Sequence, residues 1–485
     1  MCFMGKRFLL ISVLISLAFL GWGKETVLTV SDQSGFNALP GRLQQALKGK
    51  DDIKVVFSPG VYYFKEKHLT IGNVQRPDLS LTFQCQGAVF VPAEGKEKDW
   101  SDFFFNPAKL EPVEMFTSLK QVRRRPEIVD RKMGLCRVRT REQAVPEKKA
   151  GDLYLVLTQW FTSQVYKVER IERGYIYFRS EKLTSDGSPW TDPDSDYRYG
   201  KVLPRYVLLR PSSAPSGVRR GTASRFLTVS GSRFKGFSLK GARFVGNGGK
   251  DCLIQFYAVE AEHLELSGCQ FEHQHGNAVQ VQHTGGFHFL NNQLSGLWRT
   301  GIIVDYFSPR AVLSGNRFDD TGLLMMQDFC IVARGSDFLI ADNVFRDFTF
   351  SAIGIGTHYR EKIPASSSGI VEKNELYCTN GFNRYLMDSG AIYTWTSNKD
   401  VTIRNNYIHD IGGYKDNRGI FCDDGTVNVK ILNNKVLRIK NSYCIDLRRV
   451  ASVEKDPQSY VKQANVGNRL AGNSVDGKIR FENRD

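Results

Sequence analysis

Three aspartates, Asp388, Asp423 and Asp424, lie in a stretch (residues 387–426) that concentrates carboxylates, aromatic side chains and glycines. Cleavage of a glycosidic bond needs one group to protonate the leaving oxygen and a carboxylate to act as base or nucleophile. The two carboxyl groups lie roughly 5 Å apart in retaining enzymes and roughly 6.5–9.5 Å apart in inverting ones. These aspartates are therefore candidates for glycosidic chemistry, although an aspartate beside a glycine also serves to form a turn.

Such separations require elements that stack side chains at short, regular intervals. A repeat over residues 237–436 supplies them, because eight segments share one frame of alternating apolar positions. The central residues of the frame are 23 to 32 positions apart and are Ala242, Cys269, Asn292, Asn316, Asn343, Asn374, Asn406 and Asn434, with a fainter ninth copy at Asn473. Repeats of this length without helical periodicity predict an all-β fold, a right-handed parallel β-helix of about 8–10 coils. The asparagines are expected to stack as a structural ladder at a turn.

A second ladder of strands is expected to carry the functional face. Its reference positions in successive coils are Cys252, Asn277, Gly301, Cys330, Ala352, Gly390, Gly419 and Cys444. Residues one and three positions later are mostly apolar and should face the core, because side chains alternate along a strand. Even offsets should face outward, and they carry Arg334, Asp423 and Arg448 at plus four and His275, Arg299, Asp328 and Asp388 at minus two. This composition is typical of a carbohydrate cleft.

Further side chains near this face are candidates for substrate binding. Aromatic rings can stack on sugar rings, and charged groups can bind their substituents. Tyr393 falls on an inward position of the predicted ladder, so a place in the core is expected for it. The candidates are Trp395, Trp298, Tyr359, His358, Arg334 and Asp328.

Three blocks of residues carry a family resemblance. Asp388-Ser-Gly-Ala-Ile-Tyr, Ile403-Arg-Asn-Asn-Tyr-Ile-His409-Asp and Gly419-Ile-Phe-Cys-Asp-Asp-Gly-Thr resemble the Asp-x-Gly-Ala-Ile-Tyr, Asn-Tyr-Ile-His and Asp-Asp-Gly-Thr blocks of right-handed β-helix glycoside hydrolases, and of family 141 in particular. The reported activities of that family include α-L-fucosidase and xylanase, in polysaccharide-degrading systems of gut Bacteroidetes. The resemblance implies hydrolysis of a plant or host polysaccharide by two aspartates, carried onto Asp388 and Asp424, with Asp423 as the less favoured choice. The blocks cover about 40 residues, and the solenoid resemblance covers residues 226–450.

The predicted ladder sets a geometric condition on this pair. Asp388 and Asp424 are seven strand positions apart, which is more than about 20 Å along a straight strand. They can converge only if the coil bends near Gly390 or Gly425. Otherwise the alternative pairs are Asp388 with Asp328, or Asp423 with Asp446.

Composition divides the rest of the chain. Lys6, Arg7 and the apolar run over residues 8–20 predict a signal peptide at residues 1–23, and hence a secreted, periplasmic or cell-surface protein without stable membrane insertion after cleavage. The expected organisation is an N-terminal cap with the first strands (24–86), an inserted β-rich module (87–225), the β-helix coils with the active-site cleft (226–450) and a C-terminal coil or cap (451–485). An amphipathic segment around residues 39–47 is expected to form a short helix that covers the open end of the solenoid.

The net charge and the cysteine pattern limit the kinds of partner and metal site that are expected. The net charge is +15, or +13 once residues 1–23 with their two basic residues are removed. Such a surface favours acidic partners, and with no nucleic-acid-binding motif present it points to an anionic polysaccharide rather than to nucleic acid. The eight cysteines beyond residue 23 include no Cys-x-x-Cys pair, so a zinc site is not expected.

Two other functions fit the same fold. Hydrolysis by two aspartates needs no cofactor. A polysaccharide lyase or epimerase acting on a uronate-containing glycan would instead use Arg334, His358 or a lysine as base, with clustered acids holding calcium. A non-catalytic glycan-binding β-helix is the other alternative.

Overall fold

The structure is a computed structural model that describes residues 24–93, 111–115, 127–130, 132–139, 154–159, 162–179, 205–210, 225–247, 252–274, 276–322, 328–357, 367–379, 388–395, 398–411, 417–440, 442–448 and 465–483. The expected signal peptide lies outside these residues. Across the part of the chain described, no helix combines the length and the apolar character that crossing a membrane requires.

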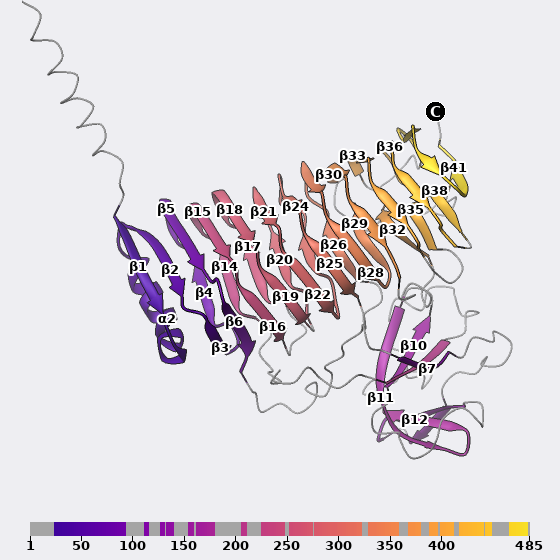
Figure 1. Ribbon diagram of the computed structural model, residues 1–485, viewed down its shortest axis with the longest axis horizontal. Helices are drawn as coiled ribbons and strands as arrows, with labels where there is room; N and C mark the ends of the chain where they lie inside the picture. The colour runs from indigo at the N-terminus through magenta and orange to yellow at the C-terminus, as the bar shows by residue number, and fades with distance from the viewer. Residues whose placement is uncertain are drawn as a thin grey trace, which may run out of the picture.

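Three parallel sheets run the length of the molecule and form a solenoid (Figure 1). In each repeating coil the chain contributes one strand to the first sheet, then one to the third and one to the second, before it returns to the first. The predicted fold class, an all-β right-handed parallel β-helix with an added β-rich module, is confirmed.

The strands of each sheet follow in stacking order. The first sheet contains β1 (Glu25–Val30), β2 (Asp52–Phe57), β5 (Gln75–Gln84), β15 (Arg233–Lys240), β18 (Glu260–Ser267), β21 (Phe287–Leu290), β24 (Val312–Ser314), β27 (Phe338–Ala341), β30 (Ser367–Glu372), β33 (Asn398–Arg404), β36 (Val429–Leu432) and β39 (Arg469–Ala471). The second sheet contains β4 (Leu69–Gly72), β14 (Leu227–Ser230), β17 (Ile254–Tyr257), β20 (Val279–Gln282), β23 (Ile302–Val304), β26 (Phe329–Ala333), β29 (Ser351–Ile355), β32 (Ser389–Thr394), β35 (Asn417–Cys422), β38 (Tyr443–Leu447) and β41 (Lys478–Phe481). The third sheet contains β3 (Gly60–Phe64), β6 (Ala88–Pro92), β16 (Arg243–Asn247), β19 (Gln270–Gln274), β22 (Gln293–Leu297), β25 (Arg317–Thr321), β28 (Val344–Phe348), β31 (Glu375–Tyr377), β34 (Tyr407–His409), β37 (Lys435–Leu437) and β40 (Ser474–Val475).

The predicted asparagine ladder holds the turn between the first and third sheets. Oδ1 of Asn343 accepts the backbone N–H of Asn316 at 2.8 Å, and Nδ2 of Asn343 donates to the carbonyl of Leu313 at 2.9 Å. The same contacts repeat from Asn292 to Asn473, so the ladder is confirmed, including its ninth copy. Each buried amide thereby satisfies backbone groups that the turn leaves without strand partners.

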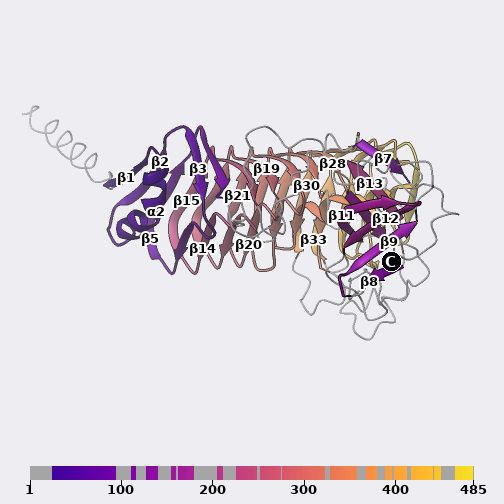
Figure 2. The same cartoon turned by 90° about the horizontal axis from the view of Figure 1, so that it is seen from below.

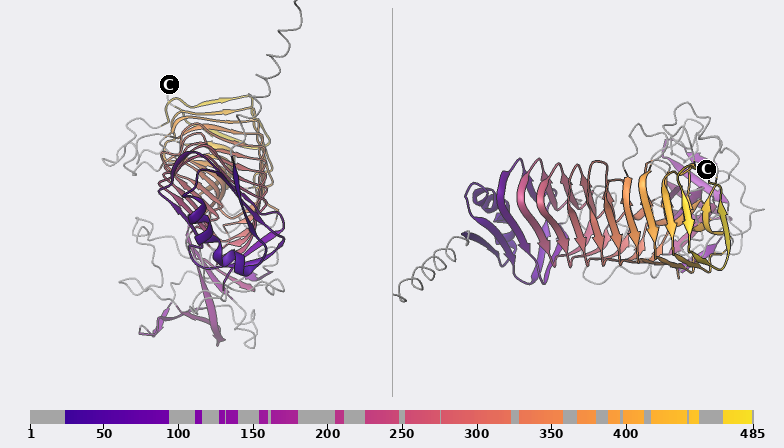
Figure 3. Two further views of the ribbon diagram at one scale, coloured as in Figure 1. Left: turned by 90° about the vertical axis from the view of Figure 1, so that its left-hand side faces the viewer. Right: turned by 90° about the horizontal axis from the view of Figure 1, so that it is seen from above.

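One continuous core fills the solenoid, and α2 (Gln33–Ala46) lies at its N-terminal end (Figure 3). Asp32 caps this helix by accepting the N–H of Gly35 at 2.7 Å. The helix buries Phe36, Leu39 and Leu43 in that core. The expected capping helix is therefore present, beginning a few residues earlier than the sequence suggested. The cysteines within the described residues are all buried thiols.

A separate antiparallel sheet is formed by the segment between β6 and β14. Its strands are β7 (Glu111–Met115), β13 (Arg205–Arg210), β10 (Tyr154–Gln159), β11 (Thr162–Glu172), β12 (Tyr175–Arg179), β9 (Leu135–Arg139) and β8 (Glu127–Asp130), in that order. Antiparallel pairing joins β10 to β11 and β11 to β12, so the β-rich module expected in this part of the chain is present. Figures 1 and 2 place this sheet beside the C-terminal half of the solenoid, although the segment leaves the solenoid near its N-terminal end.

The register of the second sheet corrects the ladder predicted from the sequence. The aligned reference positions are Leu253, Ala278, Gly301, Cys330, Ala352, Ala391, Gly419 and Cys444. The predicted reference positions Cys252, Asn277 and Gly390 each lie one residue before the observed ones. Loops of unequal length between the strands make such a one-residue error in alignment difficult to detect from the sequence. The error exchanges the inward and outward positions of the strand. Four positions after each reference lies a row on the outer face, called the outer row below: Tyr257, Gln282, Asp305, Arg334, Gly356, Trp395, Asp423 and Arg448.

Candidate active site

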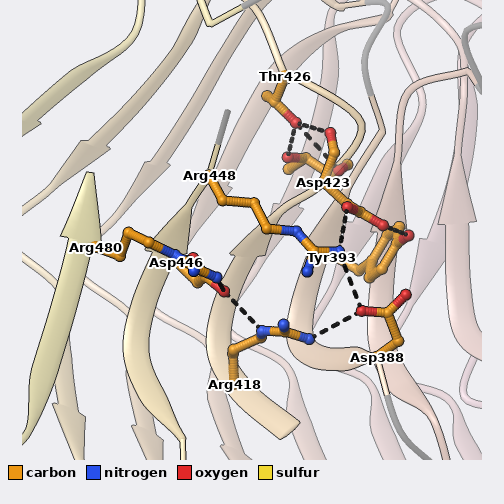
Figure 4. A network of polar contacts seen from close by, with 9 residues as sticks. Asp388, Tyr393, Arg418, Asp423, Thr426, Asp446, Arg448 and Arg480 are labelled. Carbon is orange, nitrogen blue, oxygen red and sulfur yellow. Dashed lines mark hydrogen bonds and ion pairs between the residues drawn. The ribbon is translucent and has the colours of Figure 1, made fainter. Parts of the chain in front are cut away.

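Two aspartates from adjacent coils meet at the guanidinium of Arg448 (Figure 4). Nη2 of Arg448 lies 3.4 Å from Oδ1 of Asp388 and 3.2 Å from Oδ1 of Asp423. The two carboxylate oxygens can be no farther apart than these distances laid end to end, about 6.6 Å. The side chain of Asp388 is 21% exposed and that of Asp423 is 8% exposed, so the pair lies at a partly open surface.

A bend in the coil makes this approach possible. Asp388 has a left-handed backbone with φ of 63°. A Cβ at Gly390 would lie 2.6 Å from the Cβ of Phe421 and 3.0 Å from the carbonyl oxygen of Ile392, so the chain follows a path there that a glycine alone permits. The chain bends at Asp388 itself, just before β32, and the close approach at Gly390 packs the start of that strand against β35. The bend brings Asp388 to Asp423.

Asp424 occupies a different structural position from Asp423. The N–H of Thr426 donates to the carbonyl of Asp423 at 3.1 Å, and both residues between them have positive φ, 51° at Asp424 and 68° at Gly425. This is the geometry of a type I′ turn, for which Asp-Gly is a preferred central pair. Asp424 is therefore a turn residue, although its charge lies near enough to raise the pKa of the Tyr393 hydroxyl.

Tyr393 corrects a prediction made from the slipped register. It aligns with Phe421 and Asp446 on the outer face of the second sheet, not with the core positions. Its hydroxyl donates to Oδ2 of Asp423 at 2.6 Å. Burial, together with the charges of Asp423, Asp424 and Asp388, raises the pKa of this hydroxyl well above its usual value. Tyr393 therefore stays protonated and donates to Asp423.

A second arginine, Arg418, links Asp388 to the buried Asp446. Arg418 is 2% exposed, donates from Nε to Oδ2 of Asp446 at 2.8 Å and contacts Oδ1 of Asp388 from Nη1 at 3.2 Å. Its guanidinium also lies 3.8 Å from the centre of the Phe421 ring. Arg480 approaches the other side of Asp446 at 2.7 and 2.8 Å. Asp446 is fully buried between the two arginines, which makes it an anchor for Arg418.

The environments of the two meeting carboxylates differ. Burial and the neighbouring charge of Asp423 raise the pKa of Asp388 to about 6, against the opposing effect of Arg448 and Arg418. Asp423 instead accepts hydrogen bonds from both Tyr393 and Arg448. Two carboxyl groups in unlike surroundings are the arrangement by which enzymes assign an acid and a base.

Aromatic rings cover the outer face next to this pair. Trp395 lies 5.0 Å from Tyr393 and 5.3 Å from Phe329 between ring centres. They pack above β29, where a Cβ at Gly354 would come within 2.7 Å of Phe329 and 3.1 Å of Trp395. The guanidinium of Arg334 is 5.8 Å from the Trp395 ring. Two predicted binding residues, Trp395 and Arg334, thus face each other across Gly356 on the outer row.

The remaining predicted residues lie elsewhere. Trp298 is buried. Asp328 accepts from Arg299 at 3.3 Å and from Thr300 at 3.2 Å, so Arg299 already has an acidic neighbour within the protein. Burial raises the pKa of Asp328, against the opposing effect of Arg299. His275, His358 and Tyr359 lie outside the described residues. Among the residues described, no group of three histidine, cysteine or acidic side chains is arranged to hold a metal ion.

Sequence reasoning missed the arginines that hold the site. Arg418 lies one residue before a reference position and carries no motif, and Arg448 was one of several charged outward residues. The structure favours Asp423 over Asp424 as the site residue. The sequence contained a reason for this choice, because Asp424-Gly425 is a dipeptide typical of turns.

Comparison with known proteins supports the fold. No protein-family model matches the chain, and no protein of curated function matches its sequence. A solved structure described as a glycoside hydrolase is similar over 93% of this chain and 96% of its own, with a TM-score of 0.57 and 12% identity. Weaker similarities are found to XylC in complex with xylose (TM-score 0.36, 10% identity, 86% of this chain and 70% of that chain) and to the A-module of the Azotobacter vinelandii mannuronan C-5 epimerase AlgE4 (TM-score 0.38, 10% identity, 96% of this chain and 97% of that chain). The chain therefore has the β-helix fold of a solved glycoside hydrolase over almost its whole length.

Proposed function

We propose that this protein is a glycoside hydrolase that cleaves its substrate with Asp388 and Asp423. The observation that carries the proposal is the meeting of these two carboxylates at Arg448, on a partly exposed face of the β-helix. The similarity in fold to a solved glycoside hydrolase, over 93% of the chain, supports it. So do the sequence blocks that resemble β-helix hydrolases of family 141.

The surroundings suggest a role for each aspartate. With its pKa raised to about 6, Asp388 keeps a usable protonated fraction near neutral pH and serves as the general acid. Asp423 is oriented by the Tyr393 hydroxyl and by Arg448, and it serves as the carboxylate that attacks the anomeric carbon. Arg448 contacts both groups and fixes their spacing before the substrate binds.

The spacing favours one stereochemical course. The limit of about 6.6 Å between the two oxygens lies at the lower edge of the roughly 6.5–9.5 Å found in inverting enzymes and leaves room for the roughly 5 Å of retaining ones. We therefore expect a covalent glycosyl intermediate on Asp423 and net retention. Proton NMR of the first product anomer reports this outcome directly.

The substrate proposed is an oligosaccharide or polysaccharide met outside the cell. The signal peptide predicted at residues 1–23 supports export, and the net charge of +13 beyond it favours glycans that carry acidic groups. Arg448 and Arg334 add positive charge to the site itself.

Product analysis tests the reaction type. Incubation with xylan, polygalacturonate and fucosylated xyloglucan should release reducing ends without an ultraviolet-absorbing double bond. An unsaturated uronate product, lost on treatment with a chelator, would instead identify a lyase. Binding to a glycan without turnover would identify a non-catalytic binding protein.

A further inference from the structure

Three exposed rings contact one another on consecutive coils at one edge of the second sheet, the first pair edge to face and the second pair stacked. Tyr257 ends β17, His283 follows β20 and Phe307 follows β23. The ring centres of Tyr257 and His283 are 5.5 Å apart, and those of His283 and Phe307 are 5.2 Å apart and nearly parallel. Tyr257 is 47% exposed and Phe307 is 63% exposed. These three residues are called the aromatic ladder below.

The backbone holds two of these rings outward at a cost. His283 and Phe307 have left-handed φ values of 50° and 58°. This conformation is unfavourable for a bulky side chain such as phenylalanine. Phe307 is too exposed for burial to compensate for it. The left-handed turn at His283 recurs directly after β4, β14 and β17, at Asn73, Gly231 and Ala258, so it belongs to the solenoid. Phe307 is the position at which a bulky, exposed side chain adopts this conformation, and such positions are common at binding sites.

The aromatic ladder continues into the candidate active site. Tyr257 belongs to the outer row, the same row that contains Trp395, Asp423 and Arg448. Beside the rings, Nε2 of Gln282 donates to Asp305 at 3.3 Å. Next along the solenoid, Nη1 of Arg334 donates to the Tyr306 hydroxyl at 2.9 Å, and its guanidinium faces Trp395.

The dimensions of this surface fit one kind of ligand. From β17 to β32 the second sheet advances five strands, or about 24 Å at the usual interstrand spacing. Successive coils are separated by about the length of one pyranose in an extended chain. Rings that pack on sugar faces, interleaved with amide and carboxylate groups that bond to hydroxyls, suit a polysaccharide lying parallel to the solenoid axis.

We propose that the outer face from the aromatic ladder to Asp423 binds a polysaccharide chain of several sugar units, with the ladder as its remote end. This inference rests on the proposed function and deepens it. The substrate is a long chain and not a disaccharide, because the binding surface extends well beyond the aspartates on the N-terminal side.

Affinity electrophoresis tests the proposal. The Asp388→Asn protein, which keeps bound glycan uncut, is run in native gels that contain xylan, polygalacturonate or fucosylated xyloglucan. We expect at least one of them to retard it. Adding Tyr257→Ala with Phe307→Ala should weaken the apparent Kd about tenfold or more, because each ring contributes about 1 kcal/mol. Tyr63→Ala removes an exposed ring on the third sheet instead and should leave retardation unchanged.

Two results would overturn this inference: equal retardation of the double variant and its parent, or no retardation in any of the three gels. Its failure can be told apart from that of the proposed hydrolysis. Suppose that retardation depends on the aromatic ladder but the wild type releases no reducing ends. The proposed hydrolase activity would then be wrong, and the proposed binding surface would stand. Turnover with equal kcat/KM on two-unit and eight-unit oligosaccharides would support the hydrolase and exclude the extended binding surface.

Discussion

At the scale of single residues, the arginines at this site act on their neighbouring acids in two distinct ways. Arg418 is buried against Asp446 and serves the fold, whereas Arg448 is partly exposed and touches both Asp388 and Asp423. The difference matters because breaking a buried ion pair leaves an uncompensated charge, and an exposed pair loses little.

Removing Arg418 should therefore destabilise the protein strongly. Arg418→Met removes one of the two arginines that contact the fully buried Asp446 and one of the two that contact Asp388, and we expect a loss of about 3–5 kcal/mol in the free energy of unfolding. Arg404→Met is the matched control, because Arg404 pairs with Glu372 at 2.6 Å but is 41% exposed. It should cost less than about 1 kcal/mol. Equal urea midpoints for the two variants would show that Arg418 does not brace the site.

The pH dependence of kcat/KM should reveal Asp388. A general acid works only when protonated, so activity should fall as the pH rises through about 6, the pKa of Asp388. Arg448 lowers that pKa, so Arg448→Gln should move the alkaline limb of the profile to higher pH, whatever it does to the maximal rate. Arg480→Gln removes an arginine that contacts Asp446 and should leave the limb in place. A limb that stays fixed in Arg448→Gln would argue against Asp388 as the acid.

At the scale of strands and turns, the asparagine ladder couples successive coils. Asn343 is buried, and its amide bonds to two backbone groups of the preceding coil, at Leu313 and Asn316, and to the Asn374 side chain of the next coil. Asn343→Ala should cost about 2–4 kcal/mol, since it leaves buried donors and acceptors unmatched. Asn473→Ala, at the more exposed end of the ladder, should cost clearly less because water can replace the amide. Chemical denaturation of both variants measures this gradient along the ladder, and equal losses would contradict it.

The sequence was informative about these elements to different degrees. The asparagines recur in one frame, so the β-helix and its ladder could be predicted. The second ladder could not be aligned throughout, because loops before Gly301 and Ala391 differ in length and a slip of one residue leaves the apolar pattern plausible. That slip placed Tyr393 in the core. Asp388 could be singled out, but its meeting with Asp423 depends on a left-handed backbone at Asp388 that strand periodicity does not encode.

At the scale of the whole molecule, a solenoid must protect its open ends. An exposed strand edge can pair with another chain, and α2 buries Phe36 in the core at the N-terminal end. Phe36→Asp should detach the helix and yield soluble oligomers in size-exclusion chromatography. Ala38→Asp places the same charge two residues on, at an exposed position, and should remain monomeric like the wild type. A monomeric Phe36→Asp protein would show that the end needs no cover.

The same architecture explains how distant segments form one site. Asp388, Asp423 and Arg448 come from three consecutive coils of the second sheet, whose stacking sets their spacing. The outer row extends that order toward the N-terminus and ends in the aromatic ladder. A long glycan aligned with the axis would thus be held by many coils and cut at one.

The central claim is that Asp388 and Asp423, and not Asp424, carry out the cleavage. The most direct measurement is kcat on a glycan that the wild type hydrolyses, for Asp388→Asn, Asp423→Asn and Asp424→Asn, with folding checked by denaturation. We expect the first two to lower kcat by about 10²–10⁴-fold, the usual contribution of such a group. Asp424→Asn, in its turn position, should lose less than about tenfold. Full activity in folded Asp388→Asn or Asp423→Asn, or a greater loss in Asp424→Asn, would contradict the account.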